Sequence, residues 1–310
     1  MENTRAKTTR NSLILLLTAT IWGMAFVSQS KGMDYMHPFT FNGVRSLIGA
    51  AGILLYILVS RKIAGDKAAK LDWKLNVRAG LLCGIFLTIA STLQQFGIKY
   101  TSVGKAGFIT TLYIIFVPMF GIFLKKKVAP VVWAAAGMAA VGMYLLCMTE
   151  SLRLGAGDIM VFLCAIAFAI QIMTVDHYAA RIDGAVVSCI QFTVCGVVCC
   201  IGALIWGQPT FGQLQEGLGA LLYAGVLSCG VGYTLQIVGQ KGLNPTVAAL
   251  IMSLESVIAT ISGWIAYKIG FLSTDQTLTP RQIAGCVIVF AAVILVQLPP
   301  EWFRFGKKNA

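Results

Sequence analysis

Charged side chains are scarce in this sequence of 310 residues. Asp, Glu, Lys and Arg together make up 12% of it, with 12 acidic residues against 24 basic ones, whereas hydrophobic residues make up 57% and the mean hydropathy is +0.80. Soluble globular domains carry about 25% charged residues. The composition therefore excludes an ordinary soluble domain and indicates an integral membrane protein.

Motifs for hydrolysis and for nucleotide binding are also missing. The sequence contains no GxxxxGK[ST] phosphate-binding loop, no HExxH zinc motif and no GxSxG nucleophile elbow. Its two histidines, His37 and His177, fall at the ends of apolar segments. ATP hydrolysis within this chain is therefore excluded as an energy source, and we expect neither an enzyme nor a cofactor.

Metal-binding and nucleic-acid-binding patterns are absent too. The nine cysteines all lie within apolar segments and none is spaced with a histidine as zinc ligands are, so we expect them to pack as small apolar residues and predict no metal site. The net charge of +12 comes from basic residues on short loops beside apolar segments, where anionic lipid headgroups are the natural partner. We therefore expect membrane lipids, and no nucleic acid, as partners.

The apolar segments predict ten membrane-spanning helices, because about 20 apolar residues cross a hydrocarbon core of about 30 Å. The fold class is therefore an all-α integral membrane protein. The predicted spans cover residues 12–30, 38–59, 78–98, 104–124, 129–148, 157–177, 185–206, 217–239, 246–268 and 280–298.

The distribution of Lys and Arg predicts which side of the membrane each loop occupies. With the N-terminus inside, the inner segments hold seventeen basic residues and the outer segments hold six. Short positively charged loops stay on the cytoplasmic side. We therefore expect both termini in the cytoplasm, with tails at 1–11 and 299–310, in a multi-pass protein of the plasma membrane of a prokaryote.

The chain contains an internal duplication. Residues 92–126 align with residues 234–268 at a constant offset of 142, and ten of the 35 aligned positions are identical, including a shared Thr-Leu-Gln, two glycines and two lysines. At an offset of 146, Trp22 aligns with Phe168 and Arg45 with Gln191. Each copy holds five predicted spans, an odd number, so consecutive copies insert in opposite orientations. The sequence predicts two inverted five-helix repeats, 12–150 and 156–298, with a site between them.

Polar residues deep inside the apolar segments are the candidate site, because a polar group at membrane depth is costly unless it has a cavity or a partner. The deepest carboxylate is Glu255, which could bind a cation, carry a proton or form an ion pair with Arg45. Arg45 could instead extend to the outer interface. The candidate substrate-binding residues are Trp22, Arg45, Gln94, Tyr113, Gln171, Gln191, Gln236, Ser253 and Glu255.

Five segments together resemble the EamA-type members of the drug/metabolite transporter superfamily over essentially the whole chain. They are ATIWGMAFVSQ from Ala19, PFTFNGVR from Pro38, GKAGFITTLYIIFVP from Gly104, AALIMSLESVIATISGW from Ala248 and TPRQIAGCVIVFAAVILVQ from Thr279. The sequence departs from the family pattern in two places. Tyr267–Gly270 stands where a Leu-Gly-Glu segment is common, and Ser256 stands where Pro often follows the Glu, so we expect less unwinding beside Glu255.

The resemblance implies a central cavity and the movement of small metabolites or drugs across the plasma membrane, often outward. Together with the polar residues, it predicts a secondary active transporter, as an exporter, that moves a small polar or zwitterionic molecule by alternating access. Protons are candidate coupling ions, and the protein is expected to be a monomer or a homodimer. The alternatives are a facilitative channel or uniporter-like permease, a non-transporting membrane receptor, and an intramembrane enzyme, which would need a second catalytic group beside Glu255.

Overall fold

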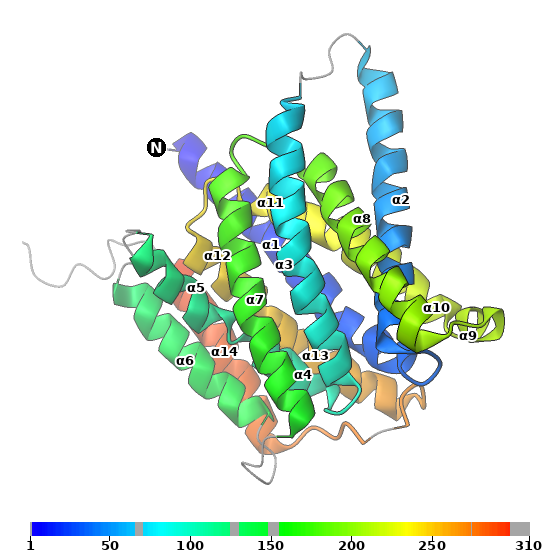
Figure 1. The fold of residues 1–310 in the computed structure, drawn as a ribbon. Helices are drawn as coiled ribbons and strands as arrows, with labels where there is room; N and C mark the ends of the chain where they lie inside the picture. The colour runs from blue at the N-terminus through cyan, green and yellow to red at the C-terminus, as the bar shows by residue number, and fades with distance from the viewer. Residues whose placement is uncertain (1, 66–70, 125–129, 148–154, 274, 298–310) are drawn as a thin grey trace, which may run out of the picture.

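The computed structural model describes residues 2–65, 71–124, 130–147, 155–273 and 275–297, and within these ranges the chain is helical with no strand (Figure 1). Eight helical stretches in these ranges are long and apolar enough to cross a membrane. They are Lys7–Gly32, Pro38–Ala64, Trp73–Ile98, Val103–Phe123, Ala156–Tyr178, Gly184–Gly207, Leu218–Gln240 and Pro245–Lys268. Each coincides with a predicted span.

Two shorter apolar helices occupy the positions of the remaining predicted spans. They are α6 (Pro130–Cys147) and α14 (Pro280–Gln297), and they pack side by side along one edge of the molecule (Figure 1). The multi-pass helical architecture is therefore confirmed, and within the described residues eight of the ten predicted spans have the length and hydropathy that crossing a membrane requires.

The helix ends differ from the prediction at two loops. Helix α1 runs over Glu2–Gly32, so residues 2–11, which we expected to be a loose tail, are helical. Helix α2 (Pro38–Ala64) and helix α3 (Trp73–Ile98) both extend into the predicted loop at residues 60–77. The predicted C-terminal tail and several loop lysines, including Lys67, Lys70 and Lys125 to Lys127, lie outside the described residues.

Two of the spanning stretches are interrupted in the middle. The first divides at Leu112 into α4 (Val103–Thr111) and α5 (Tyr113–Phe123), and the second divides at Ser253 into α12 (Pro245–Met252) and α13 (Leu254–Lys268). At the offset of 142, Ser253 aligns with Thr111, which adjoins Leu112. The two interruptions therefore lie one residue apart in the aligned copies.

The first interruption lies before Pro118, which is inside α5. The reason is that proline removes the hydrogen bond to the carbonyl four residues earlier, so the distortion appears about one turn toward the N-terminus. There, the Ile115 N–H and the Phe116 N–H both donate hydrogen bonds to the carbonyl of Leu112.

The second interruption was not expected, because Ser256 replaces a proline. Serine hydroxyls produce it by competing for main-chain acceptors. Ser253 Oγ donates to the Leu250 carbonyl at 2.7 Å, Ser256 Oγ donates to the Ser253 carbonyl at 2.8 Å, and the Ser256 N–H bonds the same carbonyl three residues back. The helix beside Glu255 is therefore interrupted without a proline.

The helices pack in a reciprocal pattern between the two aligned copies. Helix α2 packs against α8 (Gly184–Gly202), and α6 packs against α14. Helix α3 packs against α7 (Ala156–Tyr178) and α8, while the aligned partner of α3, a π-helical stretch at Tyr223–Gly232 followed by α11 (Tyr233–Gln240), packs against α1 and α2. Helix α5 packs against α7 as its aligned partner α13 packs against α1, and α4 packs against α7 as its aligned partner α12 packs against α1.

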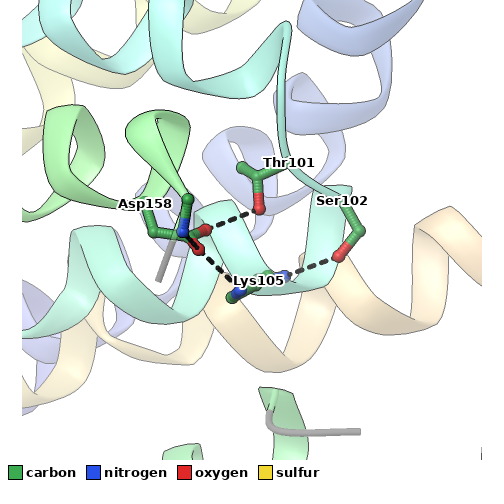
Figure 2. A network of polar contacts seen from close by, with 5 residues as sticks. Thr101, Ser102, Lys105 and Asp158 are labelled. Carbon is green, nitrogen blue, oxygen red and sulfur yellow. Dashed lines mark hydrogen bonds and ion pairs between the residues drawn. The ribbon is translucent and has the colours of Figure 1, made fainter. Parts of the chain in front are cut away.

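One buried ion pair fixes the start of α4 against the start of α7 (Figure 2). Lys105 Nζ lies 2.6 Å from Asp158 Oδ2, and the other carboxylate oxygen accepts a hydrogen bond from Thr101 Oγ1 at 2.9 Å. Asp158 also accepts from the Gly155 N–H at 2.9 Å and is 4% exposed. Three donors therefore meet at the Asp158 carboxylate, and the Ser102 hydroxyl accepts the Lys105 N–H at the start of α4.

Removing this carboxylate is expected to destabilise the protein. Asp158→Ala leaves the Lys105 ammonium without its anion and two donors without an acceptor, which costs about 2–4 kcal/mol. The midpoint of thermal unfolding in detergent should therefore fall by several degrees. The matched control is Asp34→Ala, which breaks the more exposed Lys31–Asp34 pair, worth about 0–1 kcal/mol. Equal midpoints for the two variants would contradict a structural role for Asp158.

Candidate functional site

A polar cavity lies where helices from both aligned copies meet. Its empty volume is about 580 Å³, of which about 40 Å³ is wide enough for the centre of a water molecule. The cavity is therefore narrow in this conformation. The lining residues are Trp22, Phe26, Gln29, Arg45, Ser46, Leu87, Ser91, Gln94, Thr110, Tyr113, Phe168, Gln171, Ile172, Phe192, Ser228, Cys229, Tyr233, Gln236 and Glu255.

Glu255 is the only carboxylate on this lining. It stands in the first turn of α13, directly after the interruption at Ser253, and is 4% exposed. Its Oε1 accepts a hydrogen bond from the hydroxyl of Tyr113 at 3.1 Å. Tyr113 is the residue that aligns with Glu255 at the offset of 142, so two equivalent positions of the copies touch each other. No cation among the described residues forms an ion pair with this carboxylate.

Arg45 is the only cation on the lining. It comes from α2, is 5% exposed, and its guanidinium lies 5.3 Å from the centre of the Phe41 ring. Its Nε has no hydrogen-bond partner among the described residues. Arg45 therefore does not extend to the outer interface, and it does not pair with Glu255. One positive and one negative side chain face the same cavity without neutralising each other.

Four amides, those of Gln29, Gln94, Gln171 and Gln236, add directional polar groups to the cavity. Gln94 Nε2 donates to Thr110 Oγ1 at 3.1 Å, and Gln236 Nε2 donates to Gln171 Oε1 at 3.2 Å. In the described structure, Gln171 Nε2 and Gln236 Oε1 have no partner. Buried polar atoms are usually hydrogen-bonded, so an unpartnered donor and acceptor beside a cavity suit a polar ligand or water.

Aromatic rings form one wall of the cavity. The Trp22 ring centre lies 4.5 Å from that of Tyr233, which in turn lies 5.0 Å from Phe192. Trp22 Nε1 also donates to the Ser228 carbonyl at 3.4 Å, which holds the indole in place. The wall therefore offers flat apolar surface and a cation-attracting ring face near the carboxylate.

Two predicted site residues do not line the cavity. Gln191 is fully buried, and its Cα lies 3.2 Å from the place where a Cβ on Gly84 would stand, so it belongs to the close contact between α3 and α8. Ser253 instead bonds the Leu250 carbonyl. The other seven, Trp22, Arg45, Gln94, Tyr113, Gln171, Gln236 and Glu255, meet in the cavity.

Several lining residues were missed by the sequence analysis, and the duplication holds the signal for some of them. Tyr233 aligns with Ser91 and Cys229 with Leu87 at the offset of 142, and all four line the cavity. The equivalent pairs on the lining are Trp22/Phe168, Phe26/Ile172, Ser46/Phe192, Leu87/Cys229, Ser91/Tyr233, Gln94/Gln236 and Tyr113/Glu255. Thr110 and Ser228 have no such partner on the lining, so no sequence signal pointed to them.

Comparisons with known proteins agree with this architecture. The sequence profile of the EamA-like transporter family matches the chain twice, over residues 10–148 and 155–298. An uncharacterized transporter from Archaeoglobus fulgidus is 27% identical over 290 residues, which are 92% of this chain and 84% of that protein. The uncharacterized transporter YwfM from Bacillus subtilis is 24% identical over 94% of each chain.

A solved crystal structure has the same fold. It superposes with a TM-score of 0.73 over 96% of this chain and 99% of that one, at 16% sequence identity. The similarity extends over nearly the full length of both proteins. It therefore concerns the whole helical arrangement, including the helices that surround the cavity.

Proposed function

The chain belongs to the EamA-like transporter family and is a multi-pass membrane transporter, and from that premise we propose that it moves a small zwitterionic or polar metabolite by alternating access. The observation that carries the proposal is the pair of unneutralised charges, Arg45 and Glu255, on one cavity. A buried charge is costly unless it has a partner. A substrate that brings one anionic and one cationic group would supply both partners.

The interrupted helices support this assignment. Discontinuous membrane helices in secondary transporters place free main-chain groups at the substrate site. Here the break at Leu112 lies immediately before Tyr113, and the break at Ser253 lies two residues before Glu255, so each break adjoins one member of the hydrogen-bonded pair on the cavity. The site would therefore bind substrate through side chains held beside the interruptions of two helices.

We propose that the chain has ten spans in two inverted five-helix repeats, 12–150 and 156–298. The seven equivalent pairs on the cavity lining and the reciprocal helix packing support this arrangement. So does the double match of the family profile. In such a design the two repeats exchange conformations, which opens the cavity to one side of the membrane and then to the other.

The proposal includes the orientation and the direction of transport. The excess of basic residues on one set of loops supports the proposal that both termini lie in the cytoplasm and that the protein spans the plasma membrane. We propose that the substrate is transported outward. We also propose that protons are the coupling ion, because Glu255 is the one carboxylate on the lining and can be neutralised by a proton or by a cationic substrate.

A thermal-shift screen of the purified protein tests the substrate class. Amino acids, nucleobases, nucleosides, polyamines and cationic drugs are the probes, because they differ in whether they carry an anion, a cation or both. A ligand at 100 times its Kd stabilises the native state by about 2.7 kcal/mol. We expect amino acids to raise the unfolding midpoint and nucleobases not to. A shift confined to uncharged probes would contradict the zwitterion proposal.

A further inference from the structure

A second hollow lies outside the central cavity, at the end of the molecule where Asn11 of α1 bonds the Lys241 carbonyl. It is formed between α2, α3, α8 and α11 and has an empty volume of about 1100 Å³. Three cations, Arg61, Arg181 and Lys241, line it together with two carboxylates, Asp72 and Asp183.

The two carboxylates are already used by the helices. Asp72 Oδ1 accepts from the Leu75 N–H at 3.0 Å, and Asp183 Oδ1 accepts from the N–H groups of Ala185 and Val186 at 2.9 and 3.2 Å. They cap the starts of α3 and α8, where helix dipoles place partial positive charge. The negative charges of the two carboxylates are therefore partly offset by the helix dipoles, and the three cations leave the hollow with a positive electrostatic potential.

Two of the cations, Arg181 and Lys241, by contrast have donors to spare. Lys241 Nζ donates to the Ile182 carbonyl at 3.2 Å, and an Arg181 guanidinium nitrogen donates to the His177 carbonyl at 3.4 Å. Across the described ranges, neither of these side chains forms an ion pair. An ammonium has three N–H donors and a guanidinium has five, so both can bind an anion in the hollow as well.

An apolar groove continues from the hollow along α2 toward the middle of the membrane span. It has an empty volume of about 900 Å³ and shares Tyr56, Thr234 and Val238 with the hollow. The rest of its lining is apolar: Gly49, Gly52, Ile53, Val226, Gly230, Val231 and Leu235. A Cβ on Gly52 would meet no atom within 4 Å, so the groove is open there.

We propose that the hollow and the groove together bind one anionic phospholipid, with its phosphate among Arg61, Arg181 and Lys241 and an acyl chain along Gly52. The juxtaposition favours a lipid, because a free anion would use the hollow alone and an apolar drug the groove alone. The cations also stand at the end of a spanning helix, which is the depth of headgroups, and basic pockets between helices bind such headgroups. The proposed lipid site lies at one end of α2, α3, α8 and α11, and its hollow shares no lining residue with the central cavity.

The test compares short-chain lipids on the full-length protein in detergent by native mass spectrometry. Dioctanoyl phosphatidylglycerol should bind at least about ten-fold more tightly than dioctanoyl phosphatidylcholine, and Arg181→Gln and Lys241→Gln should each weaken it about five-fold. Gly52→Leu should weaken both lipids by filling the groove. The matched control is Arg281→Gln, which removes a cation that stacks on Tyr144 elsewhere and should change nothing.

Inorganic phosphate tests whether the hollow binds a free anion instead of the headgroup of a lipid. It should bind much more weakly than the phosphatidylglycerol and should not respond to Gly52→Leu. Equal binding of the two lipids, full competition by phosphate, or phosphatidylglycerol binding that Gly52→Leu leaves unchanged would each overturn the proposal. Arg181 is exposed, so its variant should fold normally and keeps the charge test interpretable.

Discussion

Transport by the Glu255→Gln variant is expected to fall roughly 10- to 150-fold. Gln has nearly the same shape as Glu and can still accept the hydrogen bond from Tyr113, so the cavity and the fold should persist. The neutral amide cannot pair with a cationic group of the substrate or carry a proton. A hydrogen bond to a charged partner contributes about 1.5–3 kcal/mol, which corresponds to that loss. Initial rates in proteoliposomes, normalised to the amount of inserted protein, measure it.

Tyr113→Phe is the companion variant to Glu255→Gln. It removes the 3.1 Å hydrogen bond but keeps the carboxylate, so it should reduce transport less than Glu255→Gln does. The unfolding midpoints of both variants should stay near that of the wild type. If Glu255→Gln transported at the native rate, the carboxylate would be structural, whatever the result for Tyr113→Phe.

Arg45→Gln is expected to reduce the transport of zwitterionic solutes by a similar factor and to leave cationic solutes nearly unaffected. The guanidinium has a free Nε beside the cavity and no ion pair in the described part of the chain, so its anionic partner would come from the substrate. The measurement compares an amino acid with the amine that lacks its carboxylate. Arg45→Lys keeps the charge but loses the planar fork, and an intermediate rate is expected for the amino acid.

The aligned copy supplies a matched control for Arg45. Gln191 occupies the equivalent position, yet it is buried between α3 and α8 and does not line the cavity. Its two side-chain polar atoms have no partner among the described residues. Gln191→Met should therefore leave transport unchanged and should not lower the unfolding midpoint.

Equal losses of amino-acid transport and of amine transport in Arg45→Gln would show that Arg45 acts on the fold and not on the carboxylate of the substrate.

Hydropathy and the duplication predicted the parts of the structure that depend on burial. Long apolar stretches form helices because a main chain in lipid must satisfy its own hydrogen bonds, so eight predicted spans reappear. The offset of 142 pairs Tyr113 with Glu255, and this pair is in contact. The same offset pairs Ser91 with Tyr233, and both line the cavity although neither was among the predicted site residues.

The features that were not predicted depend on local geometry. The break at Ser253 arises from serine hydroxyls that bond main-chain carbonyls, which hydropathy does not register. Gln191 does not line the cavity, and its Cα lies against Gly84, where α3 closely approaches α8. The rotation of a helix about its own axis is set by such contacts, and a polar residue in a span can therefore face a neighbouring helix as readily as a cavity.

Counterflow in proteoliposomes tests alternating access most directly. Vesicles are loaded with the unlabelled solute that gave the largest thermal shift, and the entry of the labelled solute is followed. A site exposed to one side at a time predicts uptake that saturates and is accelerated several-fold by the internal solute, and both properties should be lost in Glu255→Gln. Uptake by the wild type that neither saturates nor responds to internal solute would identify a channel and contradict the proposed mechanism.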